Sequence, residues 1–220
     1  MPATKKQDLE GRLKRARSWL DAANNVSMDQ KHAVFIFLYV AFNALYGRRQ
    51  YEGTQEDTLK DREEFLRRVR TMESYDMRHG SKILLKALYQ CQQDGGSLIT
   101  NYFLRNSYWK QAKRSKELVE QFSRARIRAE SKLLKGDYEE FLRLVLERIT
   151  VLRNQVLHGC VTYGRESKGL PSLEAGLAVL QKLVPAIYEL MVRYGDHVEW
   201  PPIPYPRVGS ESHPFVDRLV

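Results

Sequence analysis

The apolar stretch AVFIFLYVAFNALY at residues 33–46 is the part of the sequence that limits the fold most strongly. It is about 14 residues long, whereas a helix that crosses a bilayer needs about 20 apolar residues. We therefore expect a helix that is buried on nearly all sides inside a protein core. Gly47 follows directly and predicts where this helix ends.

The sequence on both sides of this stretch is also patterned as helices. Residues 8–23 carry apolar side chains at helical spacing, on the stripe formed by Leu9, Leu13, Ala16 and Leu20. The other predicted helices cover residues 56–78, 81–93, 110–134, 138–158 and 172–194. Short polar side chains accept hydrogen bonds from the first amides of a helix, and the expected N-caps are Ser27, Asp137 and Ser172.

This pattern predicts an all-α fold with few strands or none. DGG at residues 94–96 is typical of a turn, and the aromatic-rich stretch 97–109 has no clear assignment. We expect a single helical domain over residues 1–195, since 220 residues can bury a substantial core. Residues 196–220 hold five prolines between positions 201 and 214 and predict a proline-rich tail that lies extended on the surface.

The formal net charge of +9 favours polyanionic partners such as RNA, DNA or an acidic membrane surface. Basic proteins with no such role are also common, so the charge leaves both options open. Residues 105–135 hold ten Lys or Arg and three Glu, which predicts either contacts to RNA phosphates or a solvated helix face. Nearby aromatic residues are expected either to stack on bases or to pack in a core or dimer interface; these are Tyr102, Phe103, Tyr108 and Trp109.

Cys91 and Cys160 are the only cysteines and form no CxxC pair, which indicates free thiols in a reducing compartment. The histidines are scattered, and none has metal-ligand spacing, so neither a metal nor a cofactor is predicted. The N-terminal segment is charged throughout and does not look like a signal peptide. Together these features predict a cytoplasmic protein that does not associate with a membrane.

Polar residues interrupt the apolar face of the predicted helix at residues 138–158. On a wheel of about 100° per residue with Ile149 at zero, an apolar arc is formed by Leu142, Val145, Leu152 and Val156. Arg153 lies about 40° from Ile149, inside this arc. A guanidinium there needs a partner, which is either a carboxylate of another helix or a phosphate held by two parallel hydrogen bonds.

His158 is expected at the end of the same helix, with Gly159 as the C′ residue. The carbonyl end of a helix favours an imidazolium, which suits a histidine that exchanges a proton near neutral pH. However, five residues on a regular helix separate two side chains by about 140°, so Arg153 and His158 do not point to one place. Either the last turn unwinds at Gly159, or two copies of the helix face each other in a dimer.

RNQVLH at residues 153–158, followed by Gly159, resembles the R-x(4–6)-H signature of the HEPN superfamily, in the form where asparagine follows the arginine. FIFLYVAFNALYGR at residues 35–48 resembles the early core helix of many members. The order of the helices is similar as well, over roughly residues 8–194. The resemblance implies a HEPN-like helical bundle, here with additional helices, that dimerises with its motif helices paired.

For function, the resemblance implies a metal-independent endoribonuclease of a toxin–antitoxin, phage-defence or RNA-processing system. Arg153 and His158 match the catalytic pair, and Asn154 matches the adjacent polar position. The implied partners are RNA, a second copy, and a cognate antitoxin or a nucleotidyltransferase. Other members are non-catalytic modules that bind RNA, a nucleotide or a protein, and this is the alternative function. A salt bridge at the helix end beside a solvated histidine is the purely structural alternative.

A metal-free nuclease would use the 2′-hydroxyl of RNA as its nucleophile. In that case we expect His158 to act as a general acid or base and Arg153 to neutralise the charge that develops on the phosphate. Asn154 would hydrogen-bond a phosphate oxygen or orient the histidine. The partner copy would supply a second arginine and a second histidine.

Overall fold

The computed structural model describes residues 5–47, 55–105, 116–160 and 169–202, and over these ranges the chain is all-α, without strands. Its α-helices are α1 (Lys5–Asn25), α2 (Lys31–Tyr46), α3 (Gln55–Arg78), α4 (Ile83–Gln90), α5 (Gln92–Thr100), α6 (Lys116–Leu134), α7 (Glu139–Leu157) and α8 (Leu170–Tyr194). Two short 3-10 helices are η1 (Tyr102–Leu104) and η3 (Gly195–His197). The predicted all-α class is confirmed.

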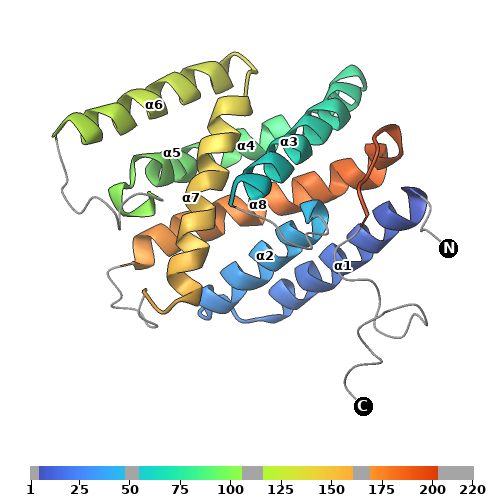
Figure 1. The fold of residues 1–220 in the computed structure, drawn as a ribbon, viewed down its shortest axis with the longest axis horizontal. Helices are drawn as coiled ribbons and strands as arrows, with labels where there is room; N and C mark the ends of the chain where they lie inside the picture. Colours follow the sequence, from blue (N-terminus) through green and yellow to red (C-terminus); the bar gives the residue numbers. More distant parts are fainter. Residues whose placement is uncertain (1–4, 48–54, 106–115, 161–168, 203–220) are drawn as a thin grey trace.

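The long helix α8 forms the middle of the core, and most of the other helices pack around it (Figure 1). Gly176 allows the closest approach, because an added Cβ would lie 2.6 Å from the Leu152 side chain and 3.0 Å from Phe35. By length and composition alone α8 could cross a membrane, but 61% of its apolar stretch is buried within the fold. That burial is what a core helix requires.

Helix α2 corresponds to the apolar stretch that limits the fold. It packs mainly between α1 and α8, and its buried residues are Val34, Phe35, Leu38, Tyr39, Ala41, Phe42 and Leu45. It ends at Tyr46, before Gly47, as predicted. Burial is less complete than expected, because Ile36, Phe37 and Val40 on its outer side are only half-buried.

The turn predicted at residues 94–96 is wrong, because these residues lie inside α5. The two glycines permit close packing instead of a turn. A Cβ at Gly95 would lie 2.5 Å from the ring of Phe141, and a Cβ at Gly96 would lie 2.4 Å from a carboxylate oxygen of Glu130. Contacts with α6 and α7 thus override the local preference of Asp-Gly-Gly for a turn.

The three predicted N-caps are also wrong. The N-cap residues of α2, α7 and α8 are Gln30, Tyr138 and Gly169, and no side chain caps these helices. α8 therefore begins two residues before Ser172, with Pro171 in its first turn. The Ser172 hydroxyl instead accepts a hydrogen bond of 2.7 Å from the Asn101 amide, which ties the segment after α5 to α8.

Two buried carboxylates of α3 cap the start of α4. Glu73 accepts hydrogen bonds from the backbone N–H groups of Leu84 and Leu85, and Asp76 accepts one of 2.6 Å from Ile83. The positive end of a helix stabilises negative charge at this place. Burial nevertheless raises the pKa of Glu73, and the two backbone hydrogen bonds oppose that rise.

The start of the predicted tail is part of the packed fold. Trp200 is only 6% exposed, and its indole N–H donates to the Gly195 carbonyl at 2.8 Å. The packed chain therefore continues past residue 195, where the domain was predicted to end. Residues 203–220, with the later prolines, lie outside the described ranges, as do Tyr108, Trp109 and residues 110–115 of the helix predicted at 110–134.

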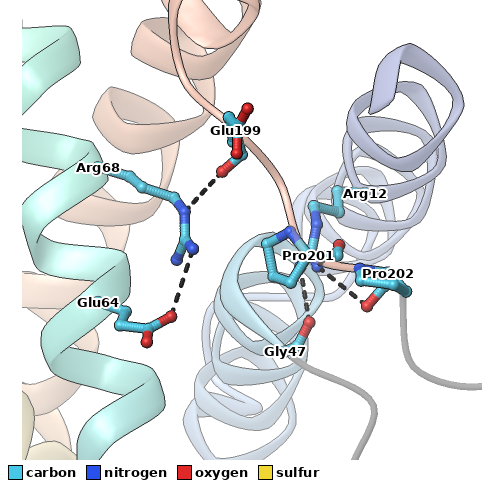
Figure 2. A network of polar contacts seen from close by, with 7 residues as sticks. All are labelled: Arg12, Gly47, Glu64, Arg68, Glu199, Pro201 and Pro202. Atoms are coloured by element: carbon cyan, nitrogen blue, oxygen red, sulfur yellow. Dashed lines mark hydrogen bonds and ion pairs between the residues drawn. The ribbon is translucent and has the colours of Figure 1, made fainter. Parts of the chain in front are cut away.

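Buried Arg12 of α1 holds this C-terminal segment against the end of α2 (Figure 2). Its guanidinium donates to the carbonyls of Gly47 at 2.6 Å and Pro201 at 2.8 Å, with longer bonds to the carbonyls of Leu45 and Pro202. Burial lowers the pKa of Arg12 to about 10, against a smaller raising effect of Asp8. Arg68 of α3 adds a bond of 2.7 Å to the Glu199 carbonyl (Figure 2).

Candidate functional site

The end of the motif helix α7 is regular and closes as predicted. The His158 N–H donates to the Asn154 carbonyl at 2.9 Å, which continues the helical bonding to the C-cap. Gly159 has a φ of +69°, and the N–H of Cys160 donates to the Gln155 carbonyl at 2.8 Å. This is a Schellman motif, in which glycine is preferred because the left-handed conformation strains other residues. The helix therefore does not unwind before His158.

Arg153 leans from α7 onto α2. Its guanidinium carbon lies 4.8 Å from the centre of the Tyr39 ring, and Nη2 donates to the Tyr39 hydroxyl at 3.3 Å. Its buried Nε has no hydrogen-bond partner, and within the described part of the chain Arg153 forms no ion pair with a carboxylate. The cation–π contact holds the side chain in place and leaves its charge without an opposite charge among these residues.

Tyr39 connects Arg153 to a second tyrosine at the end of α2. Burial raises the pKa of the Tyr46 hydroxyl, and Tyr39, which shares a hydrogen bond with it, raises it further. Arg153 and Arg62 of α3 lower it, so both arginines lie close enough to Tyr46 to act on it electrostatically. Helices α2 and α7 thus bring the Arg153 guanidinium to the Tyr39 hydroxyl, and α3 joins this group through Phe65, whose ring centroid lies 5.6 Å from that of Tyr46.

The other two predicted site residues face elsewhere. Asn154 is half-buried, and His158 is exposed at the C-cap of α7. Because α7 is regular up to this point, His158 lies about 140° around the helix axis from Arg153. One chain therefore does not bring Arg153 and His158 to the same place, and of the two arrangements derived above only the pairing of two copies can do so.

A groove between α3 and α7 was not predicted from the sequence. This α3–α7 groove has a volume of about 310 Å³ and is lined by Glu63, Leu66, Arg67, Arg70, Tyr138, Glu139, Leu142 and Arg143. A second hollow continues from it toward the turn after α6 and shares Arg70, Tyr138 and Glu139. The available sequence signal was the spacing of Glu63, Leu66 and Arg70, which places them on one face of α3.

The basic segment that was predicted at residues 105–135 pairs with carboxylates over its described part. Arg124, Arg126 and Arg128 of α6 form ion pairs with Glu120, Glu130 and Glu140. Most of these arginines are exposed, so this side of α6 is a solvated face, whereas Phe122, Ala129 and Leu133 on the other side are buried. Of the aromatic residues beside it, Tyr102 is buried and Phe103 is exposed. Phe103 is held near the motif by a bond from the Gln155 amide to its carbonyl at 2.7 Å.

In the described ranges no three His, Cys, Asp or Glu residues lie close enough to hold a metal ion. Cys91 and Cys160 are free thiols; burial raises the pKa of Cys91 to about 11, whereas Cys160 is exposed beside His158. Neither models of known protein families, nor curated proteins, nor solved structures match this chain. The geometry described above is therefore the basis for a functional assignment, together with the motif resemblance.

Proposed function

We propose that this chain is a HEPN-like, metal-independent endoribonuclease that acts on RNA as a homodimer. The main support is the environment of Arg153, which Tyr39 holds in a half-buried position without a carboxylate partner among the described residues. A partly desolvated cation that no internal group neutralises attracts an anion more strongly than a solvated one. A phosphate group matches the guanidinium geometry with two parallel hydrogen bonds.

In the proposed reaction, the 2′-hydroxyl of RNA gives its proton to the imidazole of one His158, and its oxygen attacks the adjacent phosphorus. The bond from phosphorus to the 5′-oxygen breaks, and this oxygen takes a proton from the imidazolium of the other His158. The products are a 2′,3′-cyclic phosphate and a 5′-hydroxyl end. Arg153 stabilises the negative charge on the non-bridging oxygens of the pentacoordinate phosphorane, and Asn154 hydrogen-bonds a phosphate oxygen or orients the histidine.

The dimer is part of the proposal because α7 is regular. Two antiparallel or crossed copies of α7 would place Arg153 of one chain beside His158 of the other. Following the motif resemblance, we also propose a cytoplasmic toxin–antitoxin or phage-defence setting. There, a cognate antitoxin or a nucleotidyltransferase partner would restrain the nuclease.

The test is incubation of the purified chain with total RNA in EDTA, alongside His158→Ala. General acid–base catalysis contributes about 10²- to 10⁴-fold, so this variant should lose at least about 100-fold in rate. Its circular dichroism and its mass by light scattering should match the wild-type dimer. His197→Ala is the matched control, because His197 is also exposed just after a long helix. Full activity of His158→Ala, or a monomer at the assay concentration, would refute the proposal.

A second candidate function is a non-catalytic module that binds RNA, a nucleotide or a protein. The divergence of Arg153 and His158 within one chain favours it, because binding through Arg153 does not require a histidine at the same place. This candidate predicts that the wild-type protein binds RNA without cutting it, and that Arg153→Gln weakens binding while His158→Ala does not.

A further inference from the structure

The α3–α7 groove and the motif arginine lie on the same side of α7. Leu142 lines the groove, and eleven residues separate it from Arg153, so that the two side chains point within about 20° of each other. The groove residue Arg143 lies about 15 Å from Arg153 along the helix axis. In Figure 1, α7 in yellow passes beside α3 in teal, and both helices contribute side chains to the lining of the groove.

Helix α3 forms the opposite side of the groove and of the path that we trace from the groove to Arg153. Tyr46 of α2 packs against Phe65 of α3 with ring centroids 5.6 Å apart. On α3, Arg62, Leu66 and Arg70 follow one another on one face at intervals of about one turn. Arg62 therefore lies on this face of α3 about one turn before the groove residue Leu66. Along this path the arginines are Arg153, Arg62, Arg67, Arg70 and Arg143.

The charge along the path is positive even when the carboxylates are included. Glu63 and Glu139 line the groove, and Glu139 forms an ion pair with Arg70. Arg143 is 3.9 Å from Glu147. The side chains of Arg70 and Glu139 are both more than half exposed, and exposed pairs of this kind contribute about 0–1 kcal/mol. A phosphate can therefore compete with Glu139 for Arg70.

We propose that the α3–α7 groove binds a single strand of RNA and leads its backbone to Arg153. The proposal rests on the proposed function and specifies how the substrate reaches that site. Phosphates would contact Arg67, Arg70 and Arg143, and bases would lie on the half-buried side chain of Leu66, which forms part of the lining. A span of about 15 Å corresponds to about four stacked nucleotides at about 3.4 Å each.

A single strand fits the groove better than a duplex. The hollow of about 310 Å³ is at the lower end of the size of pockets that hold one small ligand. It can accept one base at a time, and in a duplex each base is already stacked and paired. The adjoining hollow beside Lys135 and Ser74 extends the path in the direction away from Arg153.

The experiment measures binding of a 12-nucleotide single-stranded RNA that is 2′-O-methylated throughout and so cannot be cleaved. The groove variant is Arg67→Gln, Arg70→Gln and Arg143→Gln. The control variant is Arg17→Gln, Arg124→Gln and Arg193→Gln, which removes the same charge from exposed arginines that are each paired with a carboxylate one turn away. Fluorescence anisotropy at several salt concentrations gives the dissociation constant and its salt dependence.

The groove variant should bind at least about tenfold more weakly, and the slope of log K against log salt should fall by about 2, since each phosphate contact on a single strand contributes about 0.7. The control variant should lose threefold or less. Glu139→Gln should bind about two- to fivefold more tightly, a gain that a misfolded variant cannot produce. Equal losses in the groove and control variants, no binding by the wild type, or equally tight binding of the matching RNA duplex would overturn the proposal.

Cleavage of unmodified RNA by the same proteins separates this inference from the proposed function. If the wild type binds the modified RNA through the groove but cuts no RNA, the nuclease assignment fails and the groove assignment stands. If the wild type cuts RNA and the groove variant binds and cuts as the control variant does, the groove assignment fails and the nuclease assignment stands.

Discussion

Replacing Trp200 by alanine should destabilise the whole helical fold, although this residue lies in the stretch that the sequence marks as a tail. Its side chain is buried in the same apolar cluster as the helices, and its indole N–H is bonded to the Gly195 carbonyl. The substitution removes both interactions. It leaves a cavity at the place where the C-terminal segment meets α1 and α8.

The size of the effect follows from the burial of the indole. A tryptophan buries about 200 Å², which at about 25 cal/mol per Å² corresponds to about 5 kcal/mol as an upper value. Substitutions of Phe or Trp by Ala in protein cores cost about 3–5 kcal/mol. We therefore expect a loss of about 4 kcal/mol in the free energy of unfolding and a fall in Tm of about 8–16 °C for a chain of this length.

Urea unfolding followed by circular dichroism at 222 nm measures this loss. The matched control is Trp19→Ala, because Trp19 is 37% exposed and packs against Phe37 at the surface of α1 and α2. That variant should lose about 2 kcal/mol or less, since no closed cavity forms. If Trp200→Ala costs no more than Trp19→Ala, the C-terminal segment is not part of the core.

Three further predictions concern other parts of the fold. Tyr39→Phe keeps the ring under Arg153 but removes a hydrogen bond of about 1 kcal/mol, so single-turnover RNA cleavage should slow about fivefold. Tyr39→Leu also removes the cation–π contact and should be slower still. Equal cleavage rates for the wild type and both variants would contradict the role of Tyr39. Gly95→Ala should lower the free energy of unfolding in urea by about 1–3 kcal/mol, because the added Cβ would meet Phe141. Gly136 has a φ of +86° and open space around it, so Gly136→Ala should lower it by only about 1 kcal/mol, from backbone strain. Burial raises the pKa of Glu73 in the folded state, so its contribution to stability is complete below its unfolded pKa and is lost as the pH rises through the folded value. The stability of Glu73→Gln relative to wild type in urea unfolding should therefore increase as the pH rises above about 4.3, where an unfolded Glu ionises. A difference that does not change with pH would show that Glu73 is not desolvated.

Periodicity was sufficient to predict the described helices other than α5, because burial depends on spacing along one element. The stripe that includes Leu142, Ile149 and Leu152 appears as a buried face of α7, and Gly159 ends that helix as predicted. Gly95 was misassigned because turn preference is a property of a few neighbouring residues, whereas its environment is set by Phe141, which lies far along the chain. The proline-rich composition after Pro201 similarly concealed the packing of Trp200.

The candidate site was only partly predictable for the same reason. Arg153 could be recognised because it interrupts an apolar arc, and His158 because it precedes a glycine at a helix end. Their angular separation also follows from the sequence. The contact of Arg153 with Tyr39 and the proximity of Arg62 depend on how α2, α3 and α7 cross. No pattern within a single helix contains that information.

The hydrogen bonds of Arg12 also constrain how the protein is made. Its carbonyl acceptors at Pro201 and Pro202 lie 189 and 190 residues later in the chain. At about 5–20 residues per second, a ribosome needs about 10–40 s to synthesise that length. For most of this interval Arg12 can bond only to the carbonyls of Leu45 and Gly47, because its other two acceptors do not yet exist. The first helix of the protein can reach its final state only after nearly the last described residue has emerged.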